Sequence, residues 1–250
     1  MRGPLVVALL VVGCAREPVG PAQLLSQARQ ALAERERRLS SFHLVVATTE
    51  SGQQASHEVW FRSPNRSRGE VRTEPRRTVA FDGERLVTID HQGQKLSTFT
   101  LSLPAEKAAY VLASTFQPFV PEGFRAPLLP SRGVTASATS RRGAANAVEL
   151  TVEPAAGVTV VQVLRLPGGD FLEKRTASNG SLEVLRVEDE TCDRVLGLCV
   201  PRRLVLERDG ARLGETVLER IELNPALPAS TFSPELPKGY TAEQHELAEP

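Results

Sequence analysis

The side chains able to do acid–base, metal or nucleophilic chemistry are few in this sequence and show no catalytic spacing. No histidine belongs to a His-Glu-x-x-His pattern, and no Gly-x-Ser-x-Gly segment supplies a nucleophile elbow. The segment Gly168-Gly169-Asp170 precedes an expected strand and not a helix, so we interpret it as a hairpin turn and not a phosphate loop. We therefore expect no enzyme, no catalytic residue, no metal site and no cofactor. The four histidines lie far apart: His43, His57, His91 and His245.

A different chemistry, covalent attachment of a lipid, is indicated at Cys14. Arg2 and the roughly ten apolar residues that begin at Leu5 have the pattern of a secretory signal and are too short to span a bilayer. The segment ends in Val11-Val12-Gly13-Cys14, which resembles the lipobox of bacterial lipoproteins. The resemblance implies a signal peptide at 1–13 and a diacylated Cys14 (palmitate-type chains) on a tether at 14–20. The alternative is an ordinary signal peptide with an incidental cysteine.

The remaining cysteines, Cys192 and Cys199, are a pair closing a short loop once Cys14 is assigned to lipid. Exported proteins tend to oxidise such pairs, so we expect a disulfide at the neck of a hairpin. A metal site is the competing interpretation, but no histidine or further cysteine lies nearby in the sequence to complete four ligands.

Composition indicates a soluble globular domain outside the nucleic-acid-binding class. Among the 250 residues, 41% are hydrophobic and 24% charged, and the formal net charge is zero. A general electrostatic affinity for nucleic acid therefore has no basis, and we expect no nucleic-acid partner. Because no second apolar run has membrane length, the lipid on Cys14 would be the membrane anchor. Ala15 lacks the acidic character associated with inner-membrane retention in some bacteria, which favours the periplasmic side of the outer membrane.

Two helices are expected. Pro21–Arg38 carries Leu24, Leu25, Ala28, Leu32 and Leu39 at helical spacing, and we interpret the basic run at 35–38 as its solvated end. A second helix is expected over Ala105–Thr115, with Pro104 in its first turn.

The rest of the chain has the alternation of a mostly β, α+β protein. Asp82-Gly83, Asn179-Gly180 and Asp209-Gly210 are hairpin signals, so the strands they join are antiparallel. Adjacent Trp60 and Phe61 must point to opposite faces of one strand. After Leu223 we expect an irregular course, with one domain over 21–240 and a tail over 241–250. Strands are expected over Phe42–Thr49, His57–Arg62, Arg66–Thr73, Thr78–Phe81, Arg85–Asp90, Lys95–Leu101, Val134–Ala138, Ala147–Val152, Val158–Leu166, Phe171–Ala177, Ser181–Asp189, Val200–Arg208 and Arg212–Leu223.

An apolar loop rich in proline and phenylalanine follows the second helix, over Phe116–Pro130. Its prolines forbid a long regular element, so it must cover a core or face a partner. Helix and loop together are apolar enough to form a roof over one face of the sheet. We expect that roof and the strands to line an apolar hollow, with these candidates: Phe42, Leu44, Val46, Val87, Ile89, Phe99, Leu101, Val111, Phe116 and Phe119.

The order of elements resembles the outer-membrane lipoprotein carrier (LolA/LolB) superfamily. The likeness rests on the helix Leu24–Leu39 leading into the strand at Phe42, on Phe81-Asp82-Gly83-Glu84-Arg85-Leu86-Val87, and on the close from Ile221-Glu222-Leu223-Asn224-Pro225 to Pro237-Lys238-Gly239. It implies a strongly curved antiparallel sheet, an unclosed barrel, with helices capping its concave side. The soluble carrier of that superfamily is not lipidated, so a lipobox points towards its lipid-anchored relatives.

Three functions agree with these observations. The first is a lipid-anchored envelope protein that binds an acyl chain or a lipidated protein in the hollow, in lipid or lipoprotein transport. The second is an envelope-stress sensor or regulator that contacts a membrane protein. The third is a structural lipoprotein whose hollow is filled by its own side chains.

Overall fold

The described part of the chain, residues 19–127, 129–130, 132–139 and 146–248 of a computed structural model, forms one large sheet with two α-helices. α1 spans Pro21–Arg38, α2 spans Ala105–Phe116, and η2 is a short 3-10 turn at Ala229–Phe232. The signal segment and Cys14 lie outside the described residues. The strands are β1 (Ser41–Glu50), β2 (Gln53–Arg62), β3 (Arg66–Val71), β4 (Arg77–Phe81), β5 (Arg85–Asp90), β6 (Lys95–Ser102), β7 (Thr135–Thr139), β8 (Ala147–Ala155), β9 (Val158–Arg165), β10 (Asp170–Ser178), β11 (Ser181–Asp193), β12 (Leu198–Arg208), β13 (Ala211–Leu223) and β14 (Thr241–Ala248).

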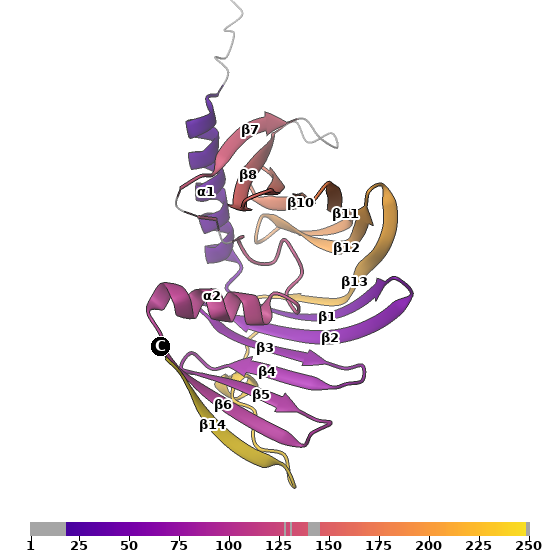
Figure 1. Cartoon of the computed structure of the whole chain (residues 1–250). Helices are drawn as coiled ribbons and strands as arrows, with labels where there is room; N and C mark the ends of the chain where they lie inside the picture. The colour runs from indigo at the N-terminus through magenta and orange to yellow at the C-terminus, as the bar shows by residue number, and fades with distance from the viewer. Residues whose placement is uncertain (1–18, 128, 131, 140–145, 249–250) are drawn as a thin grey trace, which may run out of the picture.

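The sheet is open and curved, as expected. Its strand order is β14-β6-β5-β4-β3-β2-β1-β13-β12-β11-β10-β9-β8-β7, so β14 and β7 are the two free edges. The central strand β1 pairs with both β2 and β13 and joins the two halves of the sheet, in which every neighbouring pair is antiparallel except β14 and β6. Figure 1 shows these halves, with α1 beside β7 and β8 and α2 crossing in front of the first strands. The protein is therefore mostly β, with the helices on the concave side.

The end of the chain differs from the expected irregular course. Thr241–Ala248 forms β14 and pairs with β6 in parallel, Thr241 opposite Lys95 and Ala248 opposite Ser102. Seven of its eight residues are exposed, and only Leu247 is half-buried. Thr241 is the only β-branched residue of this strand, which has no Val, Ile, Phe, Tyr or Trp. Backbone pairing with an open sheet edge therefore determines this strand, and alternation in the sequence does not.

Turn chemistry explains how tightly the strands are connected. Asn179-Gly180 and Asp209-Gly210 have positive φ at both residues, the geometry of two-residue hairpins. Asp82-Gly83 differs, because only Gly83 has positive φ and the connection includes Glu84. There the Asp82 carboxylate accepts hydrogen bonds from the backbone N–H groups of Glu84 and Arg85, which closes the turn from the side chain.

Two apolar clusters lie on the concave face of the sheet, one in each half. The first cluster packs β1–β5, part of β12 and β13 against the end of α2 and the loop that follows it. The second cluster packs β7–β12 against α1. The first contains Leu39, Phe42, Leu44, Val46, Val59, Phe61, Val79, Phe81, Leu86, Phe116, Phe119, Phe124, Leu198, Val200 and Leu218. The second contains Leu24, Ala28, Leu32, Ala136, Val148, Leu150, Leu164, Phe171, Val187 and Leu204.

Candidate functional site

The loop after α2 is held on the concave face by Phe119. Its ring lies against the backbone of β3 at Gly69, where a Cβ would be 2.5 Å from Phe119 Cδ1. The Phe119 carbonyl oxygen is 3.0 Å from His57 Nε2, and the two rings meet edge-on at 5.9 Å. Burial lowers the pKa of His57 below its usual value, although the contact with the Phe119 carbonyl opposes this shift. Because Gly69 has no side chain, the Phe119 ring can pack directly on the backbone of β3.

Five of the ten candidate lining residues lie inside the first cluster. Phe42, Leu44 and Val46 on β1 have no exposed surface, and Phe116 and Phe119 are also buried. Stacking of Phe42 on Phe61 and an edge contact with Phe124 join strand and loop side chains directly. The centre of the expected hollow is therefore occupied by the protein's own side chains.

Val87 and Ile89 lie on the opposite face of the sheet, which corrects their inclusion among the lining residues. Register places Leu86, not Val87, opposite Phe99 on β6, and Leu86 belongs to the first cluster. Ile89 lines a groove on the convex face. Alternation correctly paired Val87 with Ile89, but it does not say which of the two faces of a strand is concave.

The border of the first cluster, at β6 and α2, remains half-buried. Phe99 and Leu101 pack against the cluster while keeping some exposure, as does Leu112 on α2. Phe99 also stacks on His245 of β14, with ring centroids 4.9 Å apart. Val111 is half-buried on α2, and Tyr110 beside it is 69% exposed. Apolar surface therefore continues from the filled centre to an accessible edge.

Arg35 is a buried cation that joins the two halves of the concave face, where the sequence predicted a solvated helix end. It is 2% exposed and pairs with Asp170 on β10 at 2.8 Å. It also donates to the carbonyl oxygens of Gly123 and Cys199. Burial lowers its pKa, and the charge of Asp170 opposes that shift. Position 35 continues the apolar stripe of α1 at helical spacing, a signal that indicates burial.

The predicted disulfide is present. Cys192 and Cys199 are directly opposite in the β11–β12 pair, with an S–S distance of 2.04 Å. The backbone N–H of Cys199 donates to Asp170, so the disulfide lies next to the ion pair of Arg35 and Asp170. Glu190 lies within 4.8 Å of both sulfurs, but a disulfide offers no thiolate to a metal.

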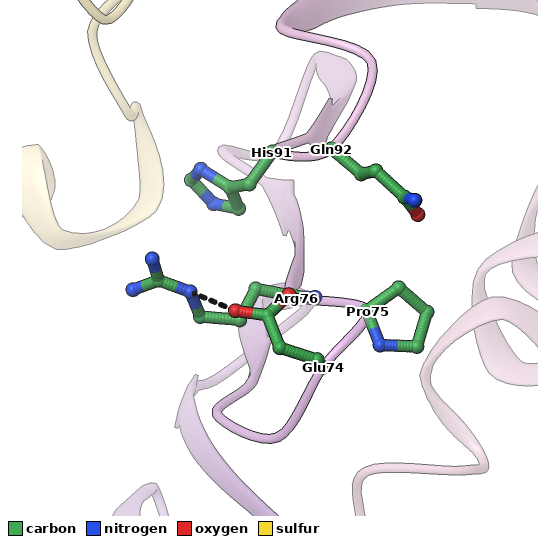
Figure 2. A pocket seen from close by; sticks show the side chains of 5 residues that line it. All are labelled: Glu74, Pro75, Arg76, His91 and Gln92. Carbon is green, nitrogen blue, oxygen red and sulfur yellow. Dashed lines mark hydrogen bonds and ion pairs between the residues drawn. The ribbon is translucent and has the colours of Figure 1, made fainter.

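The convex face carries two adjoining grooves, and the chain that returns from η2 to β14 lines the larger one. One has a volume of about 550 Å³ and the other about 490 Å³, and both are lined by Arg76 and His91. Figure 2 shows the smaller groove, with Arg76 paired to Glu74 below the His91 ring. His91 Nδ1 is 3.1 Å from the Tyr240 hydroxyl and its Nε2 is 3.1 Å from the Thr78 hydroxyl.

Charges on this convex face are balanced in pairs. Arg68 and Arg72, which also line the larger groove, pair with Glu70 and Glu58. Glu58 is shared with His43 at 2.5 Å, and the His43 ring stacks on Trp60. Trp60 thus faces the convex side while Phe61 belongs to the first cluster, as their adjacency predicted. The three arginines that line the grooves, Arg68, Arg72 and Arg76, therefore each have a carboxylate partner.

No protein-family model and no curated protein sequence matches the chain. Solved structures that comparison with this fold finds include a DUF1329 family protein from Desulfovibrio piger (10% identity, 84% of this chain and 96% of that chain, TM-score 0.52). They also include the LolA superfamily protein NE2245 from Nitrosomonas europaea (15% identity, 82% and 96% coverage, TM-score 0.48). A third is the Pseudomonas aeruginosa MucA/MucB complex (17% identity, 83% and 60% coverage, TM-score 0.30).

These likenesses concern the fold. At 10% identity, the Desulfovibrio structure shows a shared architecture and nothing about a ligand. The unclosed curved sheet with helices on its concave side is the architecture that the sequence resemblance implied. Within the described residues, neither helix combines the length and the apolar character that crossing a bilayer requires.

Proposed function

We propose that Cys14–Pro250 is a lipid-anchored envelope protein that binds an acyl chain, or the lipid of a lipoprotein, against the concave face. The observation that supports this proposal is the half-buried apolar border at Phe99, Leu101 and Leu112, which is continuous with the first cluster. Burial of each methylene group is worth about 0.8 kcal/mol. A chain of about sixteen carbons therefore offers roughly 12 kcal/mol before ordering costs are subtracted. The proposed location is the periplasmic side of the outer membrane.

The test uses Phe99→Arg in the Cys14→Ser form of the full chain. Phe99 is half-buried at the border, so an arginine there should leave the sheet folded and place a charge where the acyl chain would lie. Thr98→Arg is the matched control, because Thr98 is also half-buried but lies on the convex face. We expect saturable binding of a fluorescent fatty acid by the parent and by Thr98→Arg, and at least a tenfold loss in Phe99→Arg.

A structural role with a self-filled hollow is the second candidate, favoured by the complete burial of Phe42, Leu44 and Val46. Native mass spectrometry of the purified protein separates the two. Bound lipid together with saturable titration supports the binding function. If the purified protein carries no lipid and the titration does not saturate, the self-filled lipoprotein is the better account.

A further inference from the structure

The edge strand β14 is held on the sheet mainly by its backbone. Its side chains are exposed except for the half-buried Leu247. Lys95 of β6 pairs with Glu243 at 2.7 Å, but the two side chains are 43% and 44% exposed. The Ser102 hydroxyl donates to Glu246, also at an exposed site. Polar contacts in solvent contribute little, and parallel pairs are slightly less stable per residue than antiparallel ones. β14 therefore has a low local stability.

The chain just before β14 is held by contacts of its own. The Tyr240 hydroxyl lies 3.1 Å from His91 Nδ1, and the backbone N–H of Thr241 donates to the Gln94 carbonyl oxygen at 3.0 Å. β14 lies at the edge of the sheet and pairs with β6 alone, as Figure 1 shows. The residues after Thr241 can therefore leave β6 while the rest of the sheet stays in place.

The strand beneath, β6, is suited to hold a strand at its edge. Thr98 and Thr100 are β-branched, and the half-buried Phe99 and Leu101 pack against the first cluster. If β14 leaves, β6 presents a row of unpaired backbone N–H and C=O groups beside apolar side chains. An exposed edge of this kind accepts an added strand, with backbone hydrogen bonds for affinity and alternate side chains for specificity.

The register of β14 shows which side chains such a strand should carry. The His245 ring stacks on Phe99, and Leu247 lies opposite Leu101. Glu243, two residues before His245, pairs with a lysine of β6 on the same face. An aromatic hydrocarbon at the position of the imidazole would bury more apolar surface against Phe99. β14 therefore matches the edge of β6 in pattern but not in strength.

We propose that β14 is a replaceable strand, and that an extended segment of another protein takes its place on β6 in parallel orientation. This segment carries an acidic, an aromatic and an aliphatic side chain at alternate positions, where β14 has Glu243, His245 and Leu247. A strand from a second copy of this chain would only repeat the contacts of β14 and would lack its covalent tether, so it gains nothing. The inference goes beyond the proposed lipid binding and does not depend on it.

The experiment uses a fluorescein-labelled peptide, Thr-Thr-Glu-Thr-Phe-Thr-Leu-Thr, and the full chain carrying Cys14→Ser. The peptide has the acid and the leucine of β14 in register, phenylalanine in place of His245, and β-branched residues between them. The control peptide has asparagine in place of phenylalanine and leucine. Because the tether gives β14 an effective concentration on the order of millimolar, we expect weak but saturable binding of the first peptide by fluorescence anisotropy.

Two variants change the hold of β14 in opposite directions. Gln244→Pro combined with His245→Pro weakens it, because successive N–H groups of a strand point to opposite sides and one proline must remove a donor to β6. This variant should bind the peptide at least about tenfold more tightly. Thr100→Cys combined with Glu246→Cys joins two exposed register partners and locks β14 when oxidised. The oxidised lock should not bind, and a reductant should restore binding to the level of the parent treated in the same way.

Hydrogen exchange of the unlocked parent gives the same test without a substitution in either strand. With saturating peptide, amides of 241–248 should exchange faster, while those of 95–102 stay protected. Equal binding by the parent and by the oxidised lock would place the peptide elsewhere and overturn the proposal. Equal binding of the asparagine peptide, or no binding by the proline variant, would also overturn it. A dimer of the parent that the lock abolishes would show that β14 is exchanged between copies instead.

Discussion

At the scale of single residues, His57 is the titratable group most directly tied to the loop that covers the concave face. Its imidazole contacts the Phe119 carbonyl oxygen, and burial lowers its pKa from the ordinary value of 6.5. The unfolded chain therefore takes up a proton at a higher pH than the folded protein does. Stability is fully present above the unfolded pKa and decreases as pH falls from there towards the folded pKa.

We expect the urea midpoint to fall between about pH 7.5 and about pH 5.5, and His57→Gln to reduce that fall. Glutamine retains an N–H donor for the Phe119 carbonyl and does not titrate. His245→Gln, on the exposed strand β14, is the control and should keep the parent's pH dependence. An identical fall in the parent and in His57→Gln would show that the His57 proton is not responsible.

At the scale of elements, the β11–β12 hairpin is closed by the local disulfide between Cys192 and Cys199. The disulfide joins residues seven apart in sequence, and Leu196 and Leu198 beyond it pack into the first cluster. Arg38 holds the same tip to the end of α1 through the carbonyl oxygens of Leu196 and Gly197. The disulfide therefore helps to hold Leu196 and Leu198 against the first cluster.

Replacing both cysteines with serine in the Cys14→Ser background should cost at most about 2.5 kcal/mol in the free energy of unfolding, because the closed loop is short. We expect the loss to appear first as faster amide exchange in the hairpin tip. Thiol labelling of the unreduced, unfolded Cys14→Ser protein is the direct measurement, and no thiol should react. Two reactive thiols per chain would contradict the bond.

At the scale of the whole molecule, the expected attachment to a membrane depends on one residue outside the described part of the chain. Cys14 completes the lipobox pattern, and α1 begins seven positions later at Pro21. A lipid at that point would hold the sheet close to the membrane surface.

Cys14→Ser should therefore move the protein from the membrane fraction to the soluble fraction. The parent should remain with membranes after salt and carbonate washes, which remove proteins held by charge. Immunoblotting of the two fractions gives the answer. Retention of the variant through those washes would place the anchor elsewhere.

The sequence by itself determined the features that depend on neighbouring residues. The apolar stripe of α1 predicted the bounds of that helix, and the short spacing of Cys192 and Cys199 predicted a local disulfide. The alternation of side chains along a strand predicted that Trp60 and Phe61 point to opposite faces of the sheet. Each of these follows from helix or strand periodicity or from a short loop.

Only the tertiary structure decided what depends on distant segments. Periodicity does not distinguish the concave from the convex face, so Val87 and Ile89 were assigned to the wrong one. The burial of Arg35 required Asp170, 135 residues away, to offset its desolvation. β14 required the open edge of β6 as its pairing partner. These features depend on long-range contacts, which local patterns in the sequence do not specify.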